Sequence, residues 1–181
     1  MLFRSLLNAA TIYDHTHYYA VLPAGGFEAG LAIQADAYAH SVIDAAELAR
    51  ELEVIIEEAK RKADNPSAVA TETLFALLHD AHRIRRWRIG REAVLRGFTR
   101  DQVLAFYRNF YRPRNTVLAI VGDVDPGRAI AEVARHYGHL TDEPVVRTPG
   151  PAEPPPAGRG LRYQELDGDV QQSEEIGRAH V

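Results

Sequence analysis

Cysteine is absent from this sequence of 181 residues, and methionine and tryptophan occur once each. The lack of cysteine excludes disulfide bonds and every metal site built on thiolates, while the cellular compartment stays open. No apolar run approaches the roughly 18 residues that a bilayer-spanning helix needs, so we expect no membrane segment. Residues 1–10 are too short and too polar for a secretory signal.

A strong charge of either sign is also missing, because 21 basic residues face 25 acidic ones for a net charge of -4. Such a chain lacks a broad basic surface for a phosphate backbone, and we expect no nucleic-acid partner. Residues 82–88, His-Arg-Ile-Arg-Arg-Trp-Arg, are locally basic and leave a weaker alternative, an interaction module. Strong salt dependence of nucleic-acid binding would favour that alternative. The remaining composition, 46% hydrophobic and 25% charged, is typical of a globular fold.

Both ends of the chain differ from what lies between them. Residues 1–5 fit the codons GTG CTC TTC CGA TCT when GTG is read as a start codon, and residues 176–181 fit ATC GGA AGA GCA CAC GTC. These strings resemble the two ends of a common sequencing adaptor. We therefore expect adaptor-derived residues at both ends of an internal fragment, with native sequence over 6–175. Genuine coding sequence running through either junction would contradict this expectation.

Strand-like and helix-like patterns alternate along the chain. Residues 11–22 are rich in β-branched and aromatic types and predict a strand that ends at Pro23. The apolar run 116–122 predicts a strand that is covered on both faces. Apolar spacing and capping residues predict five helices: one containing Phe27, Leu31 and Tyr38, one over 44–64, one over about 66–80, one opened by the capping box Thr99 to Gln102, and one from Asp125 to about Tyr137.

Proline, glycine and alanine dominate residues 143–160, which include Pro154, Pro155 and Pro156. This composition predicts an extended linker rather than a packed element. We expect one partial domain over 6–142 before the linker. Residues 161–175 would then begin a following domain, or return to the first domain as an edge strand.

Three carboxylates converge on the helix predicted from Asp44 to Asp64. At 100° per residue, Glu47, Glu51 and Glu58 fall about 80° from the centre of its apolar stripe. The pattern alone favours ordinary solvated charges at the boundary of the core. Periodicity does not decide between that interpretation and a functional site.

An ordered set of motifs over residues 8–140 resembles one family. Asn8-Ala-Ala-Thr11 and Asp14-x-Thr-x-Tyr18 resemble the signature that follows the catalytic helix of M16 peptidases, the insulinase, pitrilysin and mitochondrial-processing-peptidase family. Glu51-x6-Glu58 resembles the Glu-x6-Glu helix of that family. The later blocks that match are Asn65-Pro66, Arg85 to Gly90, Phe106 to Asn115 and Val121 to Asp125.

The resemblance implies an α+β fold, with a mixed, largely antiparallel sheet and helices packed on one face. It implies a zinc endopeptidase that hydrolyses peptide bonds by metal-activated water. An upstream His-x-x-Glu-His motif would supply two zinc ligands and the general base, and Glu58 would be the third ligand. The resemblance gives Glu51 a supporting catalytic role. It also implies that Asn8 and Ala9 bind an extended substrate through main-chain pairing.

The chain departs from the family pattern in one respect. None of the 57 residues before Glu58 reads His-x-x-Glu-His, so we expect the catalytic helix upstream and Zn²⁺ only in the parent protein. This fragment alone is expected to be inactive. The expected partners are a peptide or unfolded polypeptide substrate and a second M16-like domain or subunit. The alternative is a non-catalytic M16-like half that binds peptides and builds the chamber with an active partner.

Other candidate residues have simpler explanations. His15 and His17 lie two apart on a predicted strand, where surface histidines are commoner than a metal chelate. His79 and His82 suit the carbonyl end of a helix. Gly25 and Gly26 lack the pattern of a phosphate-binding loop, so we propose no nucleotide site.

Overall fold

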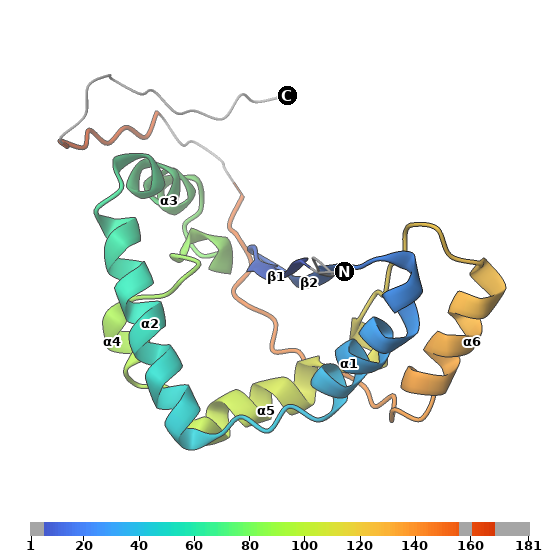
Figure 1. The fold of residues 1–181 in the computed structure, drawn as a ribbon. Helices are drawn as coiled ribbons and strands as arrows, with labels where there is room; N and C mark the ends of the chain where they lie inside the picture. The colour runs from blue at the N-terminus through green and yellow to red at the C-terminus, as the bar shows by residue number, and fades with distance from the viewer. Residues whose placement is uncertain (1–5, 156–160, 169–181) are drawn as a thin grey trace. The chain divides into compact units, whose positions relative to one another are not determined.

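The computed structural model describes residues 6–155 and 161–168, and Figure 1 shows the order of their helices and strands. The predicted adaptor-derived residues, 1–5 and 176–181, lie outside the described residues. Parts of the predicted linker and of the segment beyond it lie outside them as well. Within the described residues, no helix is long and apolar enough to cross a membrane.

Two compact units make up the chain. Unit 1 combines residues 1–44 with 99–147, and unit 2 combines 45–98 with 148–181. The backbone therefore passes from one unit to the other three times. The domain boundaries predicted from the sequence, with one partial domain over 6–142, stay a prediction.

Unit 1 begins with an antiparallel hairpin of β1 (Leu6–Thr11) and β2 (Thr16–Val21). The register pairs Leu6 with Val21 and Thr11 with Thr16. The strand predicted over 11–22 is therefore shorter, because residues 12–15 turn the chain. A hydrogen bond from the Ile12 N–H to the His15 carbonyl, at 3.0 Å, closes the turn.

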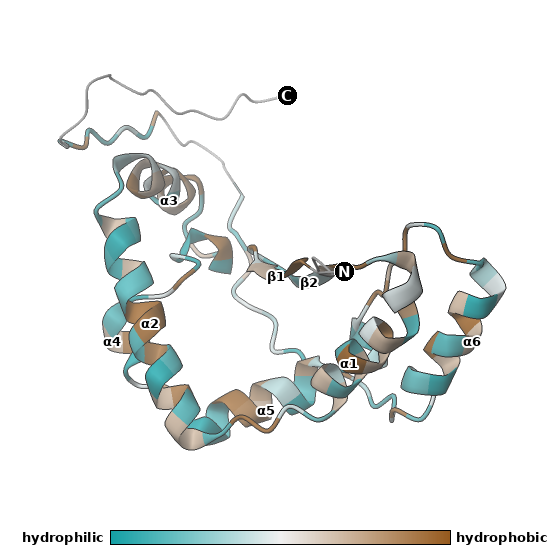
Figure 2. Cartoon of the chain, viewed as in Figure 1, coloured by the Kyte–Doolittle hydropathy of each residue, from teal (hydrophilic) through white to brown (hydrophobic). Residues whose placement is uncertain are grey.

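Five further helical segments complete the described part of unit 1: η1 (Ala24–Gly26), α1 (Phe27–Ala39), α5 (Arg100–Phe110), η3 (Pro113–Asn115) and α6 (Pro126–Tyr137). The Arg128 guanidinium of α6 donates two hydrogen bonds to Glu28 of α1, at 2.6 and 3.0 Å. Leu31 and Ala35 of α1 and Ala129 of α6 are buried. Amphipathic patterning of α6 is visible in Figure 2 as alternating brown and teal residues.

The segment 116–122 is not a strand, contrary to the prediction from its apolar run. Val117 is 93% exposed and Val121 is 96% exposed. A buried strand needs partners on its edges and covers on its faces, and the sheet within the described residues contains only β1 and β2. The run therefore fits the sequence pattern of a buried strand while lacking the neighbours that would bury it.

Unit 2 is built from α2 (Ala45–Ala63), α3 (Pro66–Leu78), η2 (Arg83–Arg85) and α4 (Glu92–Leu95). Ile56 of α2 is fully buried and Leu95 of α4 is 5% exposed. The Arg96 guanidinium joins Glu53 of α2 to Glu92 of α4, with nitrogen to oxygen distances of 2.9 and 2.8 Å. Helices therefore form the whole core of this unit within the described residues.

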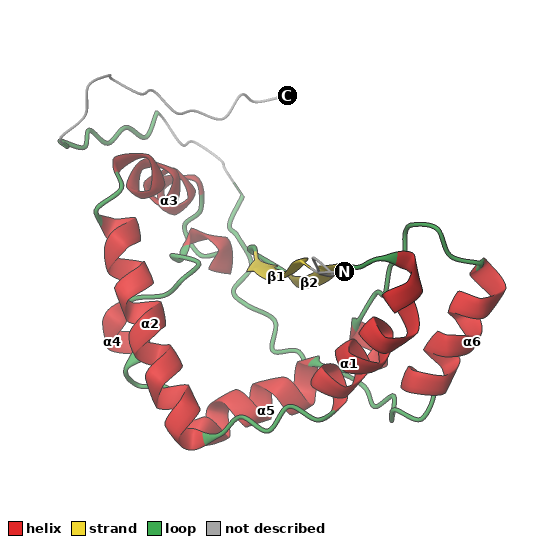
Figure 3. Cartoon of the chain, in the orientation of Figure 1, coloured by secondary structure: helices red, strands yellow, loops and turns green. Residues whose placement is uncertain are grey.

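Helices outweigh strands throughout the described residues, as Figure 3 shows. The only sheet that these residues form is the antiparallel pair β1 and β2. The α+β prediction, with a largely antiparallel sheet, is confirmed.

Candidate functional site

Glu51 and Glu58 both lie on α2, and both side chains are exposed. The Glu58 carboxylate lies 3.6 Å from the Lys62 ammonium, and the side chains are 49% and 39% exposed. An ion pair this open to water contributes little to stability. The carboxylate therefore remains available to a ligand that binds it more strongly.

Two helical turns separate the two glutamates. Seven residues rotate the helix by 700°, which returns Glu58 to within about 20° of Glu51 and advances it about 10 Å along the axis. Both side chains therefore face the same side of α2 at different heights. This geometry suits one carboxylate that touches an ion and one that acts beside it.

The third carboxylate of the predicted cluster, like Glu58, is held in an ion pair on the surface of α2. Glu47 forms an ion pair with Arg50, one turn along α2. Glu51 forms no ion pair with any residue that the structure describes. Two of the three carboxylates are therefore held in solvent-exposed ion pairs, and Glu51 is held in none within the described residues.

A complete zinc site does not exist among the described residues. They contain no group of three or more His, Asp or Glu side chains that could hold a metal ion. A catalytic zinc takes three protein ligands and keeps one position for water or substrate. Glu58 is of the right chemical type, but a single carboxylate does not make the site.

β1 carries Asn8 and Ala9, and every residue of this strand is exposed. The Ala9 N–H donates a hydrogen bond to the Asn8 Oδ1, at 2.8 Å. N–H groups of an antiparallel strand point alternately toward and away from the neighbouring strand. Because the Ala9 N–H bonds a side chain, it faces the edge of β1 that β2 does not pair. The Asn8 side chain thus occupies the position in which a carbonyl of an added strand would lie.

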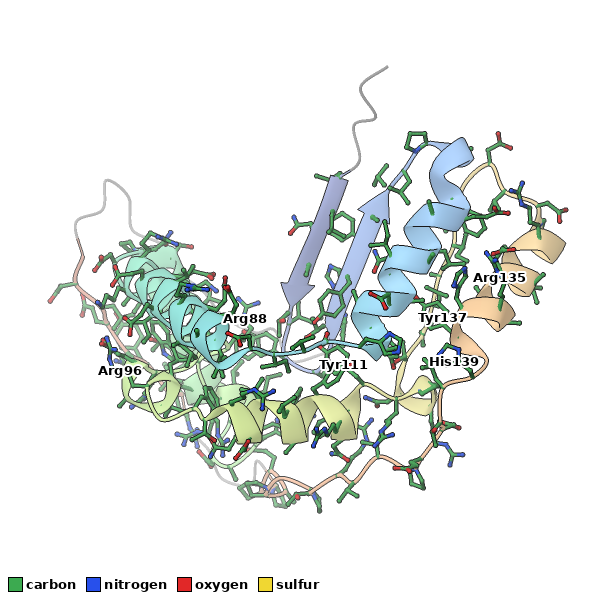
Figure 4. The ribbon with its side chains drawn as sticks, turned by 60° about the horizontal axis from the view of Figure 1, so that its bottom comes forward. Arg88, Arg96, Tyr111, Arg135, Tyr137 and His139 are labelled. Carbon is green, nitrogen blue, oxygen red and sulfur yellow. The ribbon has the colours of Figure 1, made fainter. Side chains whose placement is uncertain are left out.

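Tyrosines connect the hairpin to the rest of unit 1. The hydroxyl groups of Tyr18 on β2 and Tyr111 after α5 are hydrogen-bonded to each other. Tyr111 and Tyr137, both labelled in Figure 4, pack against Tyr38, with ring centroids 5.9 and 6.0 Å away. Tyr107 donates its hydroxyl to the Tyr38 carbonyl at 2.5 Å. These contacts hold β2, and through it β1, against the helices of unit 1.

Burial raises the pKa of three members of this tyrosine cluster. Desolvation is the largest cause for Tyr111, Tyr38 and Tyr137. For Tyr111 the hydrogen bond to Tyr18 raises the pKa further. All three phenols therefore stay protonated over the physiological range.

Glu72 of α3 is a site residue that the sequence analysis missed. Only 6% of this residue is exposed, and its Oε1 lies 3.4 Å from the Arg88 Nε. Its Oε2 is buried and has no hydrogen-bond partner among the described residues. The signal was present in the sequence, because Glu72 is the one charged residue between Pro66 and Leu78. A buried carboxylate oxygen of this kind can accept a hydrogen bond from a ligand.

Two cavities open on unit 2. One, of about 220 Å³, is lined by Glu72, Trp87 and Arg88 among others. The other, of about 360 Å³, is lined by Ile56, Trp87 and Arg91 among others and is mainly apolar. Arg88 is labelled in Figure 4. Trp87 therefore forms a wall of both cavities.

Neither pair of histidines belongs to a group of three possible metal ligands in the part of the chain that the structure describes. The rings of His15 and His17 lie 6.0 Å apart between centroids, and His15 Nδ1 is 3.0 Å from Asp14. The rings of His79 and His82 lie 5.6 Å apart, and His82 Nδ1 accepts from the Ile84 N–H. Neither pair has a third ligand within the described part of the chain.

The predicted site residues fall into two groups. Glu51 and Glu58 come together on α2 in unit 2, while Asn8 and Ala9 belong to β1 in unit 1. The roles predicted for them, in catalysis, metal binding and substrate binding, stay predictions. The contacts of each side chain are compatible with its role but do not demonstrate it.

Comparisons with known proteins match nearly the whole chain. Residues 4–88 match the family model described as "Insulinase (Peptidase family M16)". Residues 97–176 match the model described as "Peptidase M16 inactive domain". The two matches lie in sequence without overlap.

Individual relatives agree with these matches. An uncharacterized zinc protease of Mycobacterium leprae is 31% identical over 134 residues, which are 73% of this chain and 30% of the relative. The crystal structure of a protease from Helicobacter pylori has a TM-score of 0.79 at 22% identity, over 84% of this chain and 37% of that one. The ferredoxin protease FusC, solved in complex with Arabidopsis ferredoxin, has a TM-score of 0.69 at 26% identity, over 81% and 16%.

The chain is short beside these relatives. It spans 30 to 32% of the length of the first curated relatives that it matches. The helices and hairpin described above are therefore about a third of such a protein.

Proposed function

We propose that this chain, which belongs to peptidase family M16, is part of a zinc-dependent endopeptidase that acts on peptides or unfolded polypeptides. The observation that carries the proposal is the pair Glu51 and Glu58, exposed on one side of α2. Their spacing and their position after the Asn8 to Tyr18 motifs resemble the pattern of the family. The zinc protease name of the Mycobacterium leprae relative supports the same activity for the parent protein.

Glu58 would supply one carboxylate oxygen to the metal. A bound zinc would polarise the scissile carbonyl and lower the pKa of its water. The remaining ligands would have to come from outside the described residues, because none is grouped with Glu58. Glu51 lies on the same side of α2, two turns before Glu58, and would orient groups around the metal without binding it.

β1 would hold the substrate in an extended conformation. The edge of β1 that no described strand pairs offers the Ala9 N–H, to which a substrate carbonyl could bind in place of the Asn8 side chain. The displaced Asn8 amide would then be free to bond the substrate backbone. Binding through the main chain tolerates many sequences, which suits a peptidase of unfolded segments.

Peptidase activity of the full-length parent protein tests the proposal. We expect hydrolysis of an unstructured peptide that stops with a zinc chelator and returns when zinc is added. Asn8→Ala should raise KM more than it lowers kcat, because it removes a ground-state contact to substrate. Activity that persists unchanged through chelation would contradict zinc catalysis.

A second candidate function is a non-catalytic half that binds peptide and builds a chamber with an active partner. The match of residues 97–176 to a model described as an inactive domain favours it. The retention of both Glu51 and Glu58 argues against it. The sequence upstream distinguishes the two, since an intact His-x-x-Glu-His belongs to the enzyme and a degenerate one to the binding half.

A further inference from the structure

Glu153 lies in the proline-rich segment predicted as a free linker, yet its carboxylate is held by the loop that follows α3. The Asp80 N–H donates to the Glu153 Oε1 at 2.7 Å. The N–H groups of Ala81 and His82 donate to the Oε2 at 2.9 and 2.8 Å. Three successive backbone N–H groups that converge on one anion form a nest, a recurrent anion-binding conformation.

The three N–H groups lie outside the regular helices of unit 2. α3 ends at Leu78 and η2 begins at Arg83, so the three donors fall between the two helical segments. Hydrogen bonds to an ionised acceptor are roughly twice as strong as neutral ones. The Glu153 carboxylate therefore gives each of these three N–H groups a charge-assisted hydrogen bond.

A second contact lies further along the same segment. Arg162 Nη1 donates to the Leu77 carbonyl at 2.6 Å, and Arg162 Nη2 lies 2.7 Å from an Asp80 oxygen. A cation beside the last carbonyls of α3 is favoured by the helix dipole. Two side chains of opposite charge, Glu153 and Arg162, thus bind the C-terminal end of α3 and the loop that follows it.

The loop that Glu153 holds leads to the walls of both cavities in unit 2. Arg85 Nε donates to the His79 carbonyl at 3.1 Å and closes the loop on itself. Beyond it, Trp87 lines both cavities and Arg88 faces the buried Glu72. A change in the loop would therefore alter the surroundings of Glu72.

We propose that Glu153 is a latch: its carboxylate, seated in the nest of residues 80–82, fixes the loop after α3 and through it the positions of Trp87 and Arg88. Glu153 is a positioning residue, because it touches neither cavity itself. The proposal is independent of the peptidase function and concerns unit 2 alone.

Trp87 reports on the latch directly, since it is the only tryptophan of the chain. In the full chain, Glu153→Ala should shift Trp87 emission to longer wavelength and increase its quenching by acrylamide. Amide exchange at residues 80–82, measured by NMR, should accelerate about tenfold or more, because charge-assisted bonds to these groups are lost. Glu165→Ala, which removes an exposed carboxylate from the same segment, is the matched control and should change neither quantity.

A folding control and a second variant complete the experiment. The amide of the fully buried Ile56 must stay protected in each variant, which shows that unit 2 is folded. If the Glu153→Ala variant loses that protection, the Glu153→Gln variant is measured in its place. Exchange at residues 80–82 should then accelerate by a smaller factor than the roughly tenfold expected for Glu153→Ala. Unchanged Trp87 emission and unchanged exchange at 80–82 in a folded Glu153 variant would overturn the proposal.

Discussion

Glu51 and Glu58 are identical in type and share one side of α2, so only their positions along the helix separate their proposed tasks. The family pattern in the sequence predicts a role for each of them, and both roles stay predictions. Glu72 was not predicted as a site residue, because the periodicity of the sequence indicates an apolar helix but not that this side chain is buried. Glu153 was not predicted either, because composition alone suggested a spacer, and the nest that receives it depends on backbone geometry more than 70 residues earlier.

The tyrosine cluster of unit 1 predicts a loss of stability at alkaline pH. Burial raises the pKa of Tyr111 above its usual value, which is about 10 in an unfolded chain. The stability due to this group is therefore complete below pH 10 and declines as pH rises above it, because the unfolded chain then releases the proton first. We expect the urea concentration at the midpoint of unfolding to be lower at pH 11 than at pH 9, because the usual tyrosine pKa of about 10 lies between these two pH values.

Tyr111→Phe should make this alkaline decline shallower, since phenylalanine has no proton to lose. Tyr163→Phe is the control, because Tyr163 is 74% exposed. Identical pH profiles for wild type and Tyr111→Phe would show that the buried phenol does not contribute.

Among the elements, helix starts were predictable because they depend on local chemistry. The Thr99 box forms as expected, with both reciprocal hydrogen bonds between Thr99 and Gln102. Asn65 and Asp125 cap α3 and α6, each with proline at the first turn. The strands were less predictable, because pairing sets their limits: the turn at 12–15 splits one predicted strand, and 116–122 lacks a partner.

The cap of α5 gives a test at this scale. Thr99→Ala removes the acceptor of the Gln102 N–H and should lower the free energy of unfolding by about 1 kcal/mol. Urea denaturation with Thr148→Ala as control measures the difference, because Thr148 is exposed and caps no helix. A cost equal to that of the control would mean that the box contributes nothing to stability.

For the molecule as a whole, the residues proposed for substrate binding and for the metal belong to different units, each with its own core. The left-handed backbone of Ile43, with φ of 47°, lies just before the chain first leaves unit 1. Arg100 donates to the Ile43 carbonyl at 2.6 Å and to the Val42 carbonyl at 3.3 Å. A β-branched residue rarely adopts this conformation, and the two hydrogen bonds help to maintain it.

Zinc binding by this chain alone should be weak. Glu58 is an isolated carboxylate, and one such ligand competes poorly with water for the metal. Metal analysis after dialysis should find far less than one zinc per chain. About one tightly retained zinc per chain would instead show that other residues, such as His15 and His17, complete a site.

The most direct measurement is the zinc content of the full-length parent protein and of two variants. Glu58→Gln should abolish peptidase activity and release most of the zinc, because a neutral amide replaces an anionic ligand. Glu51→Gln should impair turnover with zinc still bound, because Glu51 acts beside the metal. If both variants kept full activity and full zinc, α2 would present only solvated charges, and the assignment of the chemistry to this helix would be wrong.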